Sequence, residues 1–189
     1  MGNIILYLHK SLDGVVSDPQ RWMRFGDDML EDALAYYDTL DTVVVGGHTY
    51  RSMAEYWQAA EKTSVSLLER AFARKINRIN KIVLTRSPME LVWNHSQQLL
   101  LSDRETLIRD MEKLKRESGG KHISVESGIR TWRLFLQAGL FDEMRLFVHP
   151  VIAGQGEKLF SGLEPEVSMR LQNRIDFEGG VVLLHYRRA

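Results

Sequence analysis

The stretch from His122 to Phe160, HISVESGIRTWRLFLQAGLFDEMRLFVHPVIAGQGEKLF, indicates how the chain folds. It reads as a strand, a turn at Ser127-Gly128, a helix, a second strand and a loop in which proline and glycine recur between Pro150 and Gly156. A strand that delivers a small residue and a glycine to a helix start lets backbone amides approach a phosphate closely, and the helix adds its N-terminal partial charge. This stretch therefore predicts alternating strands and helices, with an anion site at Ser127-Gly128.

The same arrangement occurs earlier in the chain. The β-branched residues from Val43 to Val45 run into Gly46-Gly47, and His48-Thr49-Tyr50-Arg51 then opens a second helix. Glycine often serves such a turn where no ligand binds, so one junction alone is weak evidence. Two junctions in a chain of 189 residues favour a dinucleotide that lies across the strand ends.

Length and composition exclude several classes of protein. With 44% hydrophobic and 26% charged residues, the chain is expected to form a single domain over residues 1–189. Lysine plus arginine equals aspartate plus glutamate at 25 each, so no overall positive field attracts nucleic acid or an anionic membrane. Cysteine is absent and the six histidines show no metal-ligand spacing, so no metal site is predicted. No apolar run approaches the roughly 20 residues that cross a bilayer, and no signal peptide is evident, which predicts a cytoplasmic protein.

Apolar periodicity locates the expected elements. Helices are predicted at 28–37, 50–56, 65–79, 103–117 and after Gly128. Strands are predicted at 3–8, 42–45, 81–85, 99–101, 123–125, 143–148, 167–175 and 181–186. Strands that alternate with helices predict a single-domain α/β fold, in which a mostly parallel twisted sheet has helices on both faces and ends in a C-terminal antiparallel hairpin.

Four segments carry a resemblance to a known family. They are Ser11–Gly14, Val44–Tyr50, Ile82–Ser87 and Gly139–Phe160. In this order they resemble the dihydrofolate reductase superfamily, especially the branch of the C-terminal reductase domain of the bacterial riboflavin-biosynthesis deaminase/reductase. The resemblance spans nearly the whole chain. It implies an NADPH-dependent oxidoreductase that transfers a hydride to a C=N or C=O group of a small heterocyclic, pyrimidine- or pterin-type substrate.

The resemblance also assigns cofactor contacts. It places the adenosine 2′-phosphate after the third strand, where a guanidinium between two hydroxyl groups suits a dianion; a solvated strand end is the alternative. It places the pyrophosphate at the two junctions, where backbone amides are offered. The predicted cofactor contacts are Gly46, Gly47, His48, Thr49, Thr85, Arg86, Ser87, Ser127, Gly128 and Ile129.

The second junction departs from the family pattern. Where the superfamily usually has paired glycines, this chain has Glu126-Ser127-Gly128. The side chain of Ser127 lies on the expected cofactor path, and a carboxylate at Glu126 would repel phosphate if it faced the site. We therefore expect Glu126 to point away from the phosphates or to be screened from them.

Acidic residues near the first strand and the following helix are the expected contacts of the acceptor. Asp13 and Glu31 are the predicted catalytic residues, and Asp28 and Trp22 the predicted substrate contacts, with an insertion of one residue able to shift the Glu31 assignment. Alternatively, Asp28 and Glu31 face water in the first turns of a helix, where acidic residues favour the dipole, and Trp22 is a core residue. The segment that contacts a phosphorylated ribityl chain in the riboflavin-pathway group is missing, which disfavours a phosphoribosyl substrate.

Two further expectations concern assembly and the C-terminal part. The continuous apolar run Val181–Leu184 suggests that both faces of the last strand need cover, which predicts a homodimer. Leu159 and Phe160 are expected to be buried at the end of the glycine-containing loop. A non-catalytic, dimeric nucleotide-binding protein that kept the fold is the alternative to a reductase, because function depends on the site and not on the fold.

Overall fold

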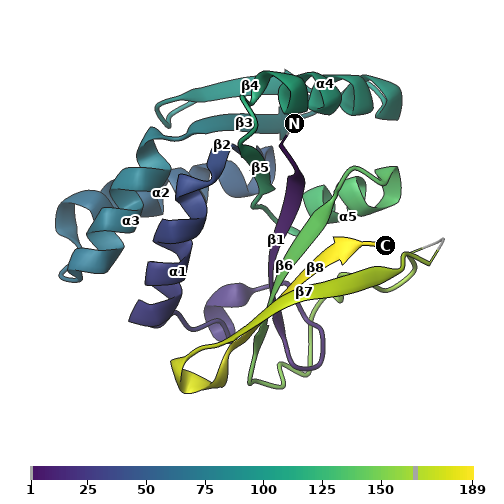
Figure 1. Cartoon of the computed structure of the whole chain (residues 1–189). Helices are drawn as coiled ribbons and strands as arrows, with labels where there is room; N and C mark the ends of the chain where they lie inside the picture. The colour runs from purple at the N-terminus through teal and green to yellow at the C-terminus, as the bar shows by residue number, and fades with distance from the viewer. Residues whose placement is uncertain (1, 164–165) are drawn as a thin grey trace.

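The computed structural model describes residues 2–163 and 166–189, which form one eight-stranded sheet with helices on both faces (Figure 1). The strands are β1 (Ile4–Ser11), β2 (Leu40–Gly46), β3 (Asn80–Thr85), β4 (Ser96–Leu100), β5 (His122–Val125), β6 (Glu143–His149), β7 (Met169–Asp176) and β8 (Val182–Arg188). The helices are α1 (Asp27–Asp38), α2 (Gly47–Thr63), α3 (Leu67–Arg78), α4 (Arg104–Glu117) and α5 (Ile129–Ala138), with short 3-10 helices η1 (Pro19–Arg21) and η2 (Glu178–Gly180).

The sheet order is β4-β3-β2-β5-β1-β6-β8-β7. The strands from β4 to β6 pair in parallel, and β8 is antiparallel to both β6 and β7. The predicted α/β class, mostly parallel sheet and C-terminal antiparallel hairpin are therefore confirmed. Parallel pairing brings the carboxyl ends of β1, β2, β3 and β5 to one edge, where the glycine junctions lie.

Two apolar clusters cover the two faces of the sheet. One joins α1, α2 and α3 to the sheet through buried residues such as Tyr36, Ala54 and Phe72. The other joins α4 and α5 to the opposite face through residues such as Met111 and Phe135. Figure 1 shows α1, α2 and α3 together on one side of the sheet and α4 and α5 on the other.

Two predicted elements are longer in the structure. Helix α2 runs to Thr63, beyond the predicted end at Tyr56, because Gln58, Ala59, Ala60, Glu61 and Lys62 are strong helix formers without glycine or proline. Strand β4 begins at Ser96 because its polar residues pair in register with β3, which a search for apolar runs does not detect.

The predicted burial of Phe160 is wrong. Leu159 is buried, but the next residue, Phe160, is 42% exposed. It lies in a turn and lines a surface groove beside the C-terminal end of α5, so only one member of the pair reaches the core. In the same loop, position 156 requires glycine, because Gly156 has a φ of 140° and an added Cβ would lie 2.4 Å from Cγ1 of Val15.

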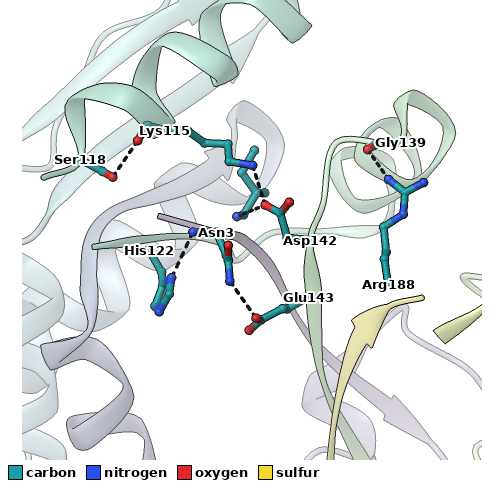
Figure 2. Close-up of polar contacts among 9 residues, drawn as sticks. Asn3, Lys115, Ser118, His122, Gly139, Asp142, Glu143 and Arg188 are labelled. Atoms are coloured by element: carbon teal, nitrogen blue, oxygen red, sulfur yellow. Dashed lines mark hydrogen bonds and ion pairs between the residues drawn. The ribbon is translucent and has the colours of Figure 1, made fainter. Parts of the chain in front are cut away.

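Polar contacts fasten β1 at the amino edge of the sheet (Figure 2). The side chain of Asn3 donates to Glu143 Oε1 at 2.7 Å, and its backbone amide donates to His122 Nδ1 at 3.1 Å. Asp142 Oδ2 accepts from the Ile4 amide at 2.7 Å and from Lys115 Nζ at 2.8 Å. These contacts join β1 to β5, β6 and α4 at the end of the sheet opposite the glycine junctions.

Within residues 2–163 and 166–189, none of the helices combines the length and the apolar character that spanning a membrane requires.

Candidate functional site

The two glycine junctions meet at the carboxyl ends of β2 and β5, which are neighbours in the sheet. The Ser127 hydroxyl lies between them and accepts from the Gly46 amide at 2.8 Å. It also contacts Thr49 Oγ1 at 3.2 Å and donates to Thr131 Oγ1 at 3.1 Å. The serine that departs from the family pattern therefore connects the first turn of α2 to the first turn of α5.

Close approach of the two junctions requires glycine. A Cβ on Gly46 would lie 2.3 Å from Thr131 Oγ1 and 2.8 Å from Ser127 Oγ. A Cβ on Gly47 would lie 2.7 Å from Cγ2 of Thr85, at the end of β3. The absence of side chains here lets three strand ends converge, and it leaves the backbone amides of both helix starts close together.

Helices α2 and α5 lack side-chain caps at their N-termini. Their N-cap residues are Gly46 and Gly128, neither of which provides a side-chain acceptor. By contrast, Ser66 and Asp103 cap α3 and α4 by accepting from the third amide of the helix. The first amides of α2 and α5 therefore remain available to an external acceptor, and both helix dipoles place partial positive charge there.

The predicted phosphate contacts at the end of β3 lie at the surface. Arg86 and Ser87 are exposed, and Thr85 is half-buried. Gln98 orders this turn, since its side-chain amide donates to Thr85 Oγ1 and, at 2.7 Å, to the Ser87 carbonyl. In the described chain Arg86 makes no ion pair or side-chain hydrogen bond, so its guanidinium is free to bind an anion. His48 is also exposed, and Ile129 is half-buried at the start of α5.

Glu126 points into the core beneath α1. Its carboxylate accepts from Tyr37 at 2.6 Å and from Ser124 at 2.8 Å, and Tyr36 donates in turn to Ser124 at 3.0 Å. Burial raises the pKa of Glu126 to about 7, although these donors and Arg145 oppose the rise. The carboxylate therefore faces Tyr37 and Ser124, and its orientation relative to a bound phosphate stays a prediction. Sequence reasoning missed that this carboxyl exchanges its proton near neutral pH, one residue from Ser127.

The inward-facing carboxylate of α1 is Asp32, one residue beyond the predicted Glu31. Glu31 is exposed, whereas Asp32 pairs with Arg145 on β6 at 2.5 Å. The guanidinium of Arg145 also lies 4.4 Å from the centre of the Tyr36 ring. Arg145 Nε has no hydrogen-bond partner within the described residues. The catalytic role of Glu31 stays a prediction, and its exposure matches the alternative of a solvated first turn.

Asp13 joins two loops at the carboxyl edge. It accepts from Ser11 Oγ at 2.6 Å and from the amides of Ala153 and Gly154 at 2.9 Å each. These hydrogen bonds, that of Ser11 foremost, lower the pKa of Asp13 to about 2. A carboxylate held in this way is ionised at neutral pH and holds no proton to donate, so the structure gives Asp13 a positioning role, and its predicted catalytic role stays a prediction.

The two predicted substrate contacts lie close together. Asp28 accepts from the Met29 amide at 2.9 Å and from the Glu178 amide at 2.5 Å, and thereby joins the start of α1 to the β7–β8 turn. Trp22 is only 3% exposed, yet it lines a cavity of about 380 Å³ in front of this turn. Trp22 is therefore a core residue that also borders a cavity, and its contact with a substrate stays a prediction.

This fold is that of dihydrofolate reductase-like proteins. The model of the RibD C-terminal domain matches residues 3–183, and the chain belongs to this family. The uncharacterized proteins YyaP and YwjB of Bacillus subtilis (strain 168) are similar to it. YyaP is 26% identical over 186 residues (97% of this chain, 93% of YyaP), and YwjB is 30% identical over 195 residues (98% and 97%).

Two solved structures show the same fold. A candidate riboflavin biosynthesis protein from Shewanella sp. PV-4 has a TM-score of 0.75 and 18% identity, with 99% of both chains covered. A diaminohydroxyphosphoribosylaminopyrimidine deaminase/5-amino-6-(5-phosphoribosylamino)uracil reductase from Thermotoga maritima has a TM-score of 0.67 and 19% identity. That match covers all of this chain and 57% of the Thermotoga protein.

Proposed function

We propose that the protein is an NADPH-dependent reductase that transfers a hydride to a C=N or C=O group of a small heterocycle. The observation that carries this proposal is the meeting of two uncapped helix N-termini across Ser127, at the carboxyl ends of adjacent parallel strands. An anionic dinucleotide linkage fits such a place, because it accepts from several amides at once and is stabilised by both helix dipoles. Family membership and the reductase name of the Thermotoga protein support the reaction class.

The residues present fit NADPH. The first amides of α2 and α5 would hold the pyrophosphate, and the Thr49 and Thr131 hydroxyl groups, which contact Ser127 at the same two helix starts, could add hydrogen bonds to it. The exposed guanidinium of Arg86 binds the 2′-phosphate of the adenosine ribose. When bound, the nicotinamide supplies the hydride. The carboxylate of Glu126 faces Tyr37 on the other side of the backbone and does not oppose the phosphates.

The reaction also needs one proton for the nitrogen or oxygen of the reduced group. Glu126 is the acidic group next to the junction whose pKa, about 7, matches proton transfer at neutral pH. We assign it the role of holding this proton, and Tyr37 and Ser124, whose hydroxyl groups contact its carboxyl, would form the start of the route to the acceptor. Glu126→Gln keeps the size of the side chain and removes the exchangeable acid.

Calorimetric titration with NADPH and NADH tests the cofactor assignment. We expect saturable NADPH binding that is tighter than NADH binding, and NADPH oxidation when dihydropterins or pyrimidine precursors are added. Ser127→Gly is the matched variant, because it restores paired glycines and keeps the backbone path; we expect it to retain NADPH binding. Failure of the wild-type protein to bind either dinucleotide at millimolar concentration would remove the proposal.

The alternative of a non-catalytic nucleotide-binding protein rests on Ser127, whose hydroxyl occupies the space between the junctions. Binding of NADPH without oxidation by any acceptor, in both the wild-type protein and Ser127→Gly, would favour this alternative.

A further inference from the structure

The side chain of Gln98 closes the turn that follows β3. Gln98 belongs to β4, the edge strand that pairs in parallel with β3 (Figure 1). Its amide group contacts three residues of the turn, namely the hydroxyl of Thr85, the carbonyl of Ser87 at 2.7 Å and the backbone N–H of Met89 at 3.4 Å. One side chain from the neighbouring strand therefore holds the turn that presents Arg86.

The partners of this amide fix its orientation. The Ser87 carbonyl can only accept and the Met89 N–H can only donate, so Nε2 of Gln98 faces Ser87 and Oε1 faces Met89. The second proton of Nε2 is then donated to the hydroxyl oxygen of Thr85. A hydroxyl that accepts in this way still has its own proton to donate, and within the part of the chain that the structure describes this proton has no acceptor.

The same threonine is held on its other side by α2. A Cβ added to Gly47 would lie 2.7 Å from Cγ2 of Thr85, so the methyl group of Thr85 lies close against the first residue of that helix. With its methyl group against Gly47 and its oxygen held by Gln98, the stiff side chain of Thr85 is confined to one rotamer. Thr85 is half-buried and the next residue, Arg86, is exposed, so a ligand can reach both from solvent.

We propose that Gln98 is a positioning residue for the discrimination of NADPH from NADH. Its donation to Thr85 leaves the Thr85 proton for a phosphate oxygen, and its hold on the Ser87 carbonyl keeps the turn in the shape that presents the Arg86 guanidinium. A 2′-phosphate monoester is largely a dianion at neutral pH and accepts from both groups, whereas the 2′-hydroxyl of NADH is uncharged. This inference rests on the proposed binding of NADPH.

Calorimetric titration with NADPH and with NADH tests the role of Gln98. Gln98→Glu keeps the shape of the side chain, removes both donors and places a negative charge beside Thr85 and Arg86. Gln98→Met removes the donors without adding a charge. Gln97→Glu is the matched control, because Gln97 is the preceding residue of β4, is exposed and points to the opposite face of the sheet, so this variant adds the same charge away from the turn.

We expect Gln98→Glu to lower the ratio of NADPH affinity to NADH affinity at least about tenfold, and Gln98→Met to lower it about threefold to tenfold. The NADH affinity of both variants should stay within about twofold of the wild-type value, which also shows that the variants fold. Gln97→Glu should keep the wild-type ratio within about twofold.

The other results overturn the proposal. A wild-type preference for NADPH that both Gln98 variants retain would contradict the role of Gln98 and leave the reductase proposal standing. Equal losses of NADPH and NADH affinity in these variants would show that Gln98 supports only the fold. A ratio that falls equally in Gln97→Glu and Gln98→Glu, and not in Gln98→Met, would show that added charge alone is responsible. Failure of the wild-type protein to bind either dinucleotide would remove the proposed function, and this inference with it.

Discussion

Replacement of Glu126 by glutamine should change how stability depends on pH. In the folded protein this carboxyl has a pKa of about 7, compared with 4.5 for the ordinary side chain. A rise of this size corresponds to about 3 kcal/mol, at about 1.4 kcal/mol per pKa unit. The conversion applies because the side chain is buried and hydrogen-bonded.

The sign follows from proton binding. Between pH 4.5 and about 7 the folded protein keeps the Glu126 proton and the unfolded chain has lost it, so the free energy of unfolding falls as the pH rises. The cost is absent below this window and complete above it. His9 and His149, whose pKa values are lowered, contribute the opposite slope at acid pH, but they do so in both proteins and cancel in the difference.

Urea unfolding followed by tryptophan fluorescence from pH 5 to pH 8 measures the effect. As the pH rises from 5 to 8, the free energy of unfolding of Glu126→Gln should increase by on the order of 3 kcal/mol relative to that of the wild-type protein. Glu143→Gln is the control, because a hydrogen bond from His185 lowers the pKa of Glu143 below 4.5, so its removal should cost stability throughout the range from pH 5 to pH 8. A difference between Glu126→Gln and wild type that stays constant within about 0.5 kcal/mol across this range would refute the reasoning.

Further predictions concern the cofactor, the junctions, the C-terminal loop and assembly. Arg86→Ala should weaken NADPH binding about tenfold to a hundredfold in calorimetry and leave NADH binding nearly unchanged, since it removes one charge-assisted phosphate contact; equal losses would contradict phosphate recognition. Gly46→Ala should lower the free energy of unfolding in urea by about 1 to 3 kcal/mol, because its Cβ would overlap Thr131 Oγ1. An unchanged unfolding midpoint would mean that the two junctions separate easily. Leu159→Ala should lower the free energy of unfolding by about 2 to 5 kcal/mol, whereas Phe160→Ala should lower it by about 1 kcal/mol or less, because Phe160 is partly exposed. The reverse order would contradict the placement of the loop. Light scattering at micromolar concentration should give a homodimer, and a monomer would remove that proposal.

Much of the fold can be predicted from the sequence because strong local signals mark its elements. β-Branched strands that run into glycine, as Val43–Val45 do into Gly46, are visible within a few residues. Strand β4 lacks such signals, since it is polar and is defined by its pairing with β3. Phe160 shows a different limit: an apolar residue next to a buried leucine still points outward when the backbone turns between them.

The site is harder to predict, because its contacts join residues far apart in the chain. A local signal did exist for Asp32, which lies three residues after the buried Met29 and four before the buried Tyr36 and therefore shares their face. Its partner Arg145 interrupts an apolar strand and was a second signal. No local pattern indicates that His9 meets His149 or that Ser127 connects two helices, because these contacts depend on sheet register.

The central claim is that NADPH binds across the starts of α2 and α5. Backbone amide NMR of nitrogen-15-labelled protein during titration with NADPH tests this claim most directly, since each amide reports on its own surroundings. We predict that the largest saturable shifts belong to Gly47, Thr49 and Ile129, with Arg86 responding to NADPH and not to NADH. Saturable shifts confined to another part of the molecule, or no shifts at millimolar NADPH, would contradict the claim.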